Sequence, residues 1–156
     1  MFTCTIKRPI GIRISNNLAE DIIGLADNHP YYIQHLSHII WDLAENEVHA
    51  DMVMQALDYT LNRESVVFTE FWDRLSLNQR KVLVALNLKN KDEGIFSQAV
   101  SHRFKLPPVS SLQKSLKTLY GQELIEKVNG DYQITDVFFR LWIKRNYTIN
   151  PPYYLT

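Results

Sequence analysis

Residues 96–134 read FSQAVSHRFKLPPVSSLQKSLKTLYGQELIEKVNGDYQI, and this stretch decides the fold. Ser97 is placed to cap a short helix that carries Val100 and Phe104. The Leu-Pro-Pro segment 106–108 then ends it, because proline lacks the N–H that continues a helix and biases the preceding residue towards extended conformations. The stretch therefore begins with a short helix and a turn.

A second helix is expected directly after these prolines. Ser110 followed three residues later by Gln113 predicts a capping box at its start. Gly121 predicts an end in the left-handed conformation. Leucines recur between these signals at helical spacing and predict one buried face: Leu112, Leu116 and Leu119.

A tight hairpin completes the stretch. Two β-prone runs, residues 124–128 and 131–134, are joined by Asn129-Gly130, the strongest short-range hairpin signal. Helix, turn, helix and hairpin in this order predict a winged helix-turn-helix. This fold serves either to hold DNA or to regulate attached machinery, and the rest of the chain has to distinguish the two uses.

Composition predicts a folded protein of one ordinary domain or two small ones. The chain has 156 residues, 46% of them hydrophobic and 12% aromatic, which is enough apolar material to fill a core. The lone Cys4 cannot form an internal disulfide, which fits a reducing compartment. With no long apolar run and no signal peptide, a soluble cytoplasmic protein is expected.

The formal net charge of zero conceals an asymmetry between the two halves. Residues 1–75 contain five basic and eleven acidic residues, a formal charge of −6. Residues 76–156 contain twelve basic and six acidic residues, a formal charge of +6. The basic half is compatible with nucleic acid and equally with docking on an acidic partner or on the acidic half.

The first half is expected to be helical throughout. Successive helices are predicted from Ser15, from Pro30, over the region of Val53 to Leu61, and over Phe68 to Leu75. Ser76 and Gln79 form a second capping box, which opens the next helix. The expected domains are residues 1–75, a winged helix over 76–146 with its last helix starting near Asp136, and an extended tail over 147–156.

Catalytic motifs are absent from the sequence. It contains no GxxxxGK[ST] phosphate loop, GxGxxG, GxSxG or HExxH. His35, His38 and Asp42 fall on one side of a helix, but two imidazoles and a carboxylate without a fourth ligand are more typical of a solvated face. We therefore expect no metal site and no autonomous enzyme. Five aromatic side chains are interpreted as core or interface rather than as the lining of a ligand pocket: Tyr31, Tyr32, Trp41, Trp72 and Trp142.

The second helix of the winged helix carries the candidates for DNA contact. Lysines on the face opposite the leucines are placed to reach base edges or phosphates in a major groove, and a further lysine lies on the wing. The alternative is an ordinary solvated helix face, since two lysines without arginine make a sparse recognition surface. The candidates are Ser111, Gln113, Lys114, Lys117, Thr118 and Lys127.

Three motifs in order resemble a known arrangement. These are Asn28–Leu36 (NHPYYIQHL), Phe71–Arg80 (FWDRLSLNQR) and Tyr132–Trp142 (YQITDVFFRLW). Together they resemble the C-terminal part of archaeal-type P-loop ATPases of the AAA+/STAND group, in which a helical lid and a winged helix follow the nucleotide-binding core. The resemblance covers about residues 12 to 145. It implies a mainly α fold, a lid-type bundle followed by a winged helix with a small β-hairpin wing.

The sequence departs from this family at three points. Asn28 stands where the family usually has glycine, although asparagine also tolerates a left-handed conformation. Val137 replaces the usual proline after Asp136, which the first helical turn tolerates. The whole phosphate-binding core is missing, and a lid cannot hydrolyse ATP without the amides, lysine and Mg²⁺ ligand that cradle phosphate.

The resemblance implies a regulatory role for this chain. Pro30 and His29 would lie on the adenine side in a full-length ATPase, which would bind ATP and Mg²⁺, while this chain alone needs no cofactor. Its partner would be the missing nucleotide-binding core or another protein, and no membrane is expected. The alternatives are a stand-alone winged-helix transcription regulator that binds DNA and a pure protein-interaction module.

Overall fold

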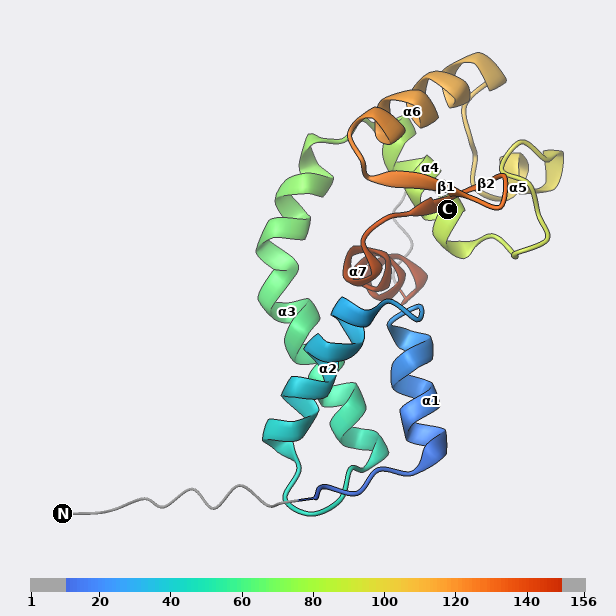
Figure 1. The fold of residues 1–156 in the computed structure, drawn as a ribbon. Coiled ribbons are helices and arrows are strands. Elements are labelled where there is room, and N and C mark those ends of the chain that lie inside the picture. Colours follow the sequence, from blue (N-terminus) through green and yellow to red (C-terminus); the bar gives the residue numbers. More distant parts are fainter. Residues whose placement is uncertain (1–10, 150–156) are drawn as a thin grey trace. The chain divides into compact units, whose positions relative to one another are not determined.

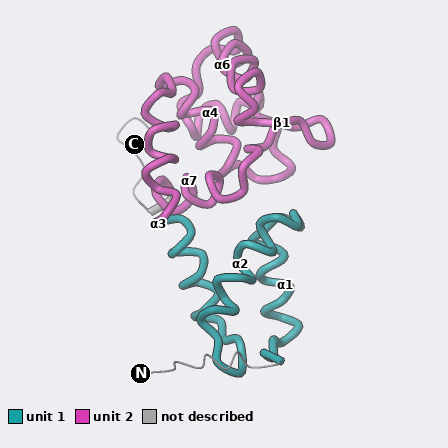
Figure 2. Tube along the Cα trace, turned by 60° about the vertical axis from the view of Figure 1, so that its left-hand side comes forward, with its two compact units in different colours: residues 1–62 teal, residues 63–156 magenta. Residues whose placement is uncertain are grey.

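The computed structural model describes residues 11–149, with side chains to residue 147; in this range it has seven α-helices and one two-stranded antiparallel sheet (Figure 1). The chain divides into two compact units, Met1–Asn62 and Arg63–Thr156 (Figure 2). The boundary predicted at Leu75–Ser76 lies within the second unit instead. A mainly helical fold with a hairpin after the helices confirms the predicted fold class.

The first unit contains helix α1 (Asn16–Leu25), helix α2 (Pro30–Leu43) and the first part of helix α3 (Ala50–Arg74). Ser15 caps α1 as predicted, because its side chain accepts a hydrogen bond from the backbone N–H of Leu18. Apolar side chains from the three helices and from the C-cap residue of α1, Ala26, are buried: Ile22, Ala26, Leu36, Ile40, Val53, Ala56, Leu57 and Leu61.

Helix α3 is continuous, and the prediction of two separate helices over this region was wrong. Residues 50–74 contain neither glycine nor proline, so nothing interrupts the backbone hydrogen bonds. Buried side chains also recur at intervals of four or seven residues along the whole helix, which keeps them on one face. These are Val53, Leu57, Leu61, Phe68 and Trp72.

The second unit is built around helix α4 (Leu77–Leu88), which packs against helix α6 (Val109–Gly121), helix α7 (Val137–Ile149) and strand β2 (Asp131–Ile134). Four consecutive residues of α4, Val82–Ala85, are fully buried. A helix segment that is buried on all sides needs apolar residues around its whole circumference, which accounts for this run in the middle of α4. Helix α5 (Gln98–Arg103) and strand β1 (Ile125–Val128) complete the unit.

Two of the predicted helix starts in this unit are confirmed. Ser76 and Gln79 form the predicted capping box at α4, in which the Ser76 N–H donates to Gln79 Oε1 at 2.7 Å and the Gln79 N–H donates to Ser76 Oγ at 3.4 Å. Ser97 caps α5 by accepting from the Val100 N–H at 3.3 Å. Both caps satisfy amides that a helix start leaves without partners.

Helix α6 ends at Gly121 as predicted, but the capping box predicted at its start and the left-handed conformation predicted for Gly121 were wrong. Pro108 is the N-cap residue and makes no side-chain hydrogen bond, so Ser110 lies inside the first turn rather than before it. The helix starts earlier because the fixed φ of proline suits a helix start and the missing N–H costs nothing there. Gly121 is helical, and the left-handed conformation falls on Glu123, at φ 59°.

The hairpin has the predicted turn. Strands β1 and β2 pair in antiparallel register from Ile125 with Ile134 to Val128 with Asp131. Asn129 and Gly130 have φ values of 53° and 87°. Positive φ at both central residues matches the turn whose twist suits a two-residue hairpin loop.

Helix α7 begins as predicted, because the carboxylate of Asp136 accepts from the Phe139 N–H at 2.8 Å. It continues to Ile149, so residues 147–149 are helical rather than part of an extended tail. The remainder of that predicted tail, residues 150–156, and Cys4 lie outside the described residues.

An aromatic cluster joins the end of α3 to α7 within the second unit. Phe68 and Trp72 come from α3, and their ring centroids lie 4.6–6.5 Å from those of α7 residues Phe139, Trp142 and Tyr147. The indole N–H of Trp142 donates to Ser65 Oγ at 3.2 Å. The cluster confirms Trp72 and Trp142 as core residues and makes the end of α3 an integral part of the winged-helix core. Of the other aromatic side chains interpreted as core or interface, Tyr31 and Trp41 are exposed and Tyr32 is half-buried.

Candidate functional site

The outward face of α6 carries most of the predicted contact residues. Gln113, Lys114, Lys117 and Thr118 are exposed, whereas Ser111 is half-buried. The Thr118 hydroxyl donates to the Lys114 carbonyl at 3.0 Å, so it already has a partner within the helix. The sequence of α6 contains two lysines and no acidic residue, which makes this face cationic.

The wing adds a third lysine. Lys127 on β1 lies opposite Tyr132 on β2, and its Nζ lies 5.0 Å from the centroid of the Tyr132 ring. This distance is within the range of a cation–π contact, which holds the ammonium group against the ring. Side chains alternate along a strand, so Glu126 lies on the other face of the hairpin, where it accepts a hydrogen bond from Gln133 at 3.0 Å.

A groove of about 350 Å³ brings part of α6 together with the wing. Of the predicted contact residues, Gln113, Lys117 and Lys127 line this groove, whereas Ser111, Lys114 and Thr118 do not. Its remaining lining is apolar or aromatic: Phe96, Leu116, Tyr120 and Tyr132. Among the described residues that line the groove, none is acidic.

The aromatic side chains of the groove were not among the site residues predicted from the sequence. Tyr120 follows Gln113 by seven residues and Lys117 by three, a spacing that places all three on one helix face and would have identified it. No such signal exists for Phe96, which reaches the groove from the loop before α5. Tyr132 lines the groove because it pairs across the hairpin with Lys127.

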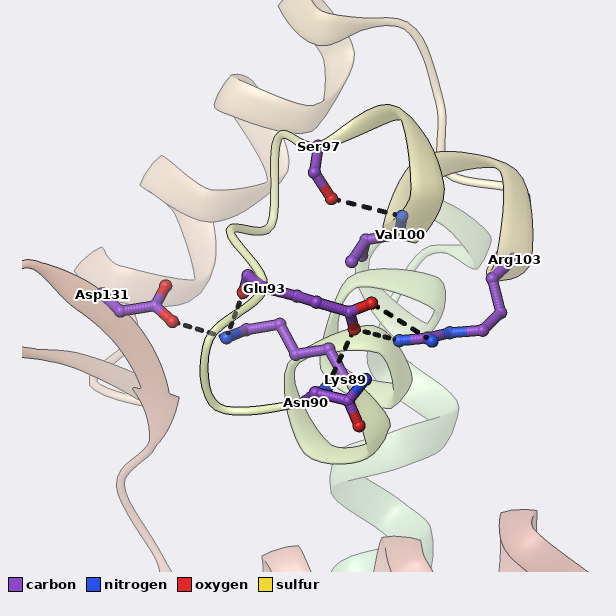
Figure 3. A network of polar contacts seen from close by, with 7 residues as sticks. All are labelled: Lys89, Asn90, Glu93, Ser97, Val100, Arg103 and Asp131. Atoms are coloured by element: carbon purple, nitrogen blue, oxygen red, sulfur yellow. Dashed lines mark hydrogen bonds and ion pairs between the residues drawn. The ribbon is translucent and has the colours of Figure 1, made fainter.

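A polar network holds the loop that carries Phe96 (Figure 3). Lys89, the residue after α4, has a side chain only 5% exposed. Its ammonium group donates to the Glu93 carbonyl at 2.8 Å and to the carboxylate of Asp131, the first residue of β2. The network thereby ties the loop to the wing.

Glu93 forms the second half of this network. Its carboxylate accepts from the backbone N–H of Asn90 at 3.0 Å and pairs with the guanidinium of Arg103 on α5. The Asn90 hydrogen bond and, secondarily, Arg103 hold the pKa of Glu93 below its ordinary value of 4.5, because both favour the charged form. Glu93 therefore joins the loop to α5 as a carboxylate.

Comparison with known proteins identifies the second unit. Residues 66–145 match the model of a family described as a probable winged helix domain. The chain belongs to this winged helix family. The match begins at Val66 within α3 and so includes Phe68 and Trp72, in agreement with the aromatic cluster. Searches among curated proteins and among solved structures gave no match.

The first unit of this winged helix protein contains the two predicted adenine-side residues at the start of α2. His29 is the N-cap residue, and its Nδ1 accepts from the Tyr31 N–H at 3.3 Å. Pro30 occupies the first helical position. Asn28 adopts a left-handed conformation at φ 59°. The side chains of residues 28–31 are exposed to solvent.

Helix α2 of the winged helix protein carries the histidine and carboxylate side chains that were weighed as metal ligands in the sequence. His38 and Asp42 lie 3.9 Å apart on the surface of α2. Residues 11–149 contain no group of three or more histidine, cysteine or carboxylate side chains placed to bind a metal ion. Within the same range, no helix combines the length and apolar character that a membrane crossing requires.

Proposed function

We propose that this chain is the lid and winged-helix region of a AAA+/STAND-type P-loop ATPase, where it couples nucleotide state to the binding of a partner. The proposal rests on three motifs that occur in the order of that family, and the last two of them lie within the matched winged helix. In this role the chain regulates and carries out no hydrolysis of its own.

The observation that carries the proposal is the conformation of residues 28–30. Asn28 replaces the usual glycine of the lid motif, and its φ of 59° is the conformation in which glycine is favoured. Pro30 then begins α2 and His29 caps it, so the turn that the motif requires is present despite the substitution.

The second local departure from the family, Val137 in place of proline, also leaves the local backbone structure unchanged. Val137 replaces a proline, yet α7 still starts at this residue because Asp136 caps it through the Phe139 N–H. Proline at a first helical position supplies only a fixed φ, since its missing N–H has no intrahelical role there. Both substitutions therefore keep the backbone that the resemblance requires.

Nucleotide contact by this chain would be limited to the base. Pro30 and His29, exposed at the start of α2, offer a ring and an imidazole to one side of an adenine. The phosphates and Mg²⁺ would be held by a phosphate loop, which this sequence does not contain. The ATPase core, in the same polypeptide or another, would supply the hydrolytic chemistry.

Isothermal titration calorimetry of the chain with ATP tests whether this chain lacks the phosphate and Mg²⁺ contacts that the ATPase core would supply. We expect no tight binding and no effect of Mg²⁺, because one side of a base contributes little affinity without phosphate contacts. The Pro30→Ala variant serves as a matched control and should behave identically. Tight, Mg²⁺-dependent binding to the chain alone would contradict the proposal.

DNA binding is the second candidate function. The observation that favours it is the outer face of α6, which carries two lysines and no acidic side chain. A helix that reads a major groove presents polar side chains to base edges. Here the wing side of α6 borders an aromatic groove instead, which favours protein recognition. A fluorescence-anisotropy titration with duplex DNA at two salt concentrations tests this candidate, because phosphate contacts produce a steep salt dependence.

A further inference from the structure

We propose that the groove between α6 and the wing binds an acidic peptide segment of a partner protein. An apolar side chain of that segment would enter between Phe96, Leu116 and Tyr120, and its carboxylates would meet Lys117 and Lys127. The proposal goes beyond the ATPase assignment and does not depend on it, because all the lining residues belong to the winged-helix unit.

The apolar part of the groove is open to an anchoring side chain. Phe96 and Tyr120 are 49% and 52% exposed, although aromatic side chains of this size are usually buried more deeply. Leu116 also lines the groove and is only 2% exposed, so the buried leucine face of α6 contributes one residue to its lining. A concave site with apolar walls and a few polar groups is the usual form of a pocket for an anchor residue.

The charge of the groove selects an anionic occupant. Lys117 and Lys127 line it, one from α6 and one from the wing. The nearby carboxylates are directed elsewhere: Asp131 contacts Lys89, and Glu126 bonds Gln133 on the other face of the hairpin. Since no acidic side chain lines the described groove, its lysines are left to pair with the carboxylates of a partner.

The same lining favours peptide over nucleic acid. Single-stranded nucleic acid binds where successive aromatic faces are open for stacking. The Tyr132 ring already has the Lys127 ammonium over it, which removes one such face. Among the described residues of the lining there is also no arginine, the side chain most often used to read guanine in duplex DNA.

The position of the groove is held by the network around Lys89. Phe96 lies on the loop that Lys89 and Glu93 fasten to the wing and to α5, so one wall of the groove is anchored at both ends. A wall that is ordered before binding loses less conformational freedom when a partner arrives. The groove is therefore preorganised for its ligand.

The proposal is tested by panning the full chain against a phage-displayed library of short random peptides and measuring the enriched peptides by fluorescence anisotropy. We expect the enriched peptides to combine Asp or Glu with an aromatic or large aliphatic residue. Replacing that apolar residue by Ser, or each carboxylate by its amide, should weaken binding by about tenfold, which corresponds to ~1.4 kcal/mol.

Charge-reversal variants locate the site. Lys117→Glu combined with Lys127→Glu should abolish binding of the enriched peptide. Lys91→Glu combined with Lys144→Glu makes the same change in net charge at exposed positions that do not line the groove, and it should leave binding intact. Tyr120→Ala tests the apolar wall separately, and circular dichroism of each variant verifies that it is folded.

Three results would overturn the proposal. The first is enrichment of basic or uncharged peptides, or no enrichment at all. The second is equal loss of binding in the two charge-reversal pairs, which would indicate attraction by net charge alone. The third is tighter binding of labelled single-stranded or duplex DNA than of any peptide, lost in the Lys117 and Lys127 pair, which would assign the groove to nucleic acid.

Discussion

The ammonium group of Lys89 contacts the carboxylate of Asp131, which lies 42 residues later in the chain. Lys89 is nearly buried, whereas the Asp131 side chain is 41% exposed. Asp131→Asn leaves the lysine without a charged partner, and we expect the free energy of unfolding to fall by about 1–2 kcal/mol, limited by water at the exposed carboxylate. Urea denaturation followed by tryptophan fluorescence measures this change.

Asp92→Asn is the matched control for this pair. Asp92 lies in the same charged loop as the network and is exposed, so the same loss of a carboxylate should change the stability little. Equal effects of the two substitutions would show that the Lys89–Asp131 contact contributes nothing to holding the wing.

The lowered pKa of Glu93 predicts that the free energy of unfolding depends on pH in the acid range. Its pKa is lowered in the folded state by the Asn90 N–H and by Arg103, so the folded state favours the carboxylate. The resulting stabilisation is complete above the ordinary pKa of 4.5 and is lost as the pH falls through the lower folded value. The wild-type protein should therefore be more stable than Glu93→Gln at pH 7, and the difference should shrink below pH 4.5.

Urea denaturation of both proteins over a series of pH values provides the measurement. Arg103→Gln should reduce the same pH dependence in part, because the Asn90 hydrogen bond remains. If the stability difference between wild type and Glu93→Gln stays constant from neutral to acid pH, the folded state does not lower the pKa of Glu93, which would contradict this prediction.

Two phenylalanines on α3 distinguish the buried face of the winged-helix unit from its surface. Phe68 is 6% exposed and contacts Phe139 and Trp142, whereas Phe71 is 45% exposed. Phe68→Ala should cost about 3–5 kcal/mol, because it removes buried surface and leaves a cavity. Phe71→Ala should cost less than about 1 kcal/mol. Similar losses in thermal unfolding would show that the end of α3 does not belong to this core.

The left-handed turn at Asn28 predicts opposite effects for two substitutions. Asn28→Gly should keep or slightly raise the stability, since glycine adopts a φ of 59° without strain. Asn28→Val should lower it by about 1–2 kcal/mol, because a β-branched side chain clashes with the backbone in this conformation. Thermal unfolding measures both, and equal stability of the two variants would be inconsistent with the turn.

The elements with local signals were predictable from the sequence. The wing follows from Asn129-Gly130, whose two positive φ values few other residue pairs adopt easily. The start of α4 follows from Ser76 and Gln79, which satisfy each other's backbone amides. Each signal involves residues only a few positions apart, so no tertiary context is needed to interpret it.

Other features depend on context that the sequence pattern does not contain. Ser110 and Gln113 match a capping box, yet the prolines before them start the helix first. The groove is assembled from a loop, a helix and a hairpin, so Phe96 and Tyr132 meet α6 only through the tertiary fold. The exposure of the lysines on α6 was predictable from the sequence, whereas the aromatic walls that suggest a peptide ligand were not.

The most direct test of the proposed function is mass spectrometry of the native protein purified from its source cells. The account predicts that peptides with a GxxxxGK[ST] phosphate loop occur in the same polypeptide or in a partner present at equal abundance. A native protein that contains these 156 residues, and that purifies without any phosphate-loop sequence in itself or in a stoichiometric partner, would contradict it.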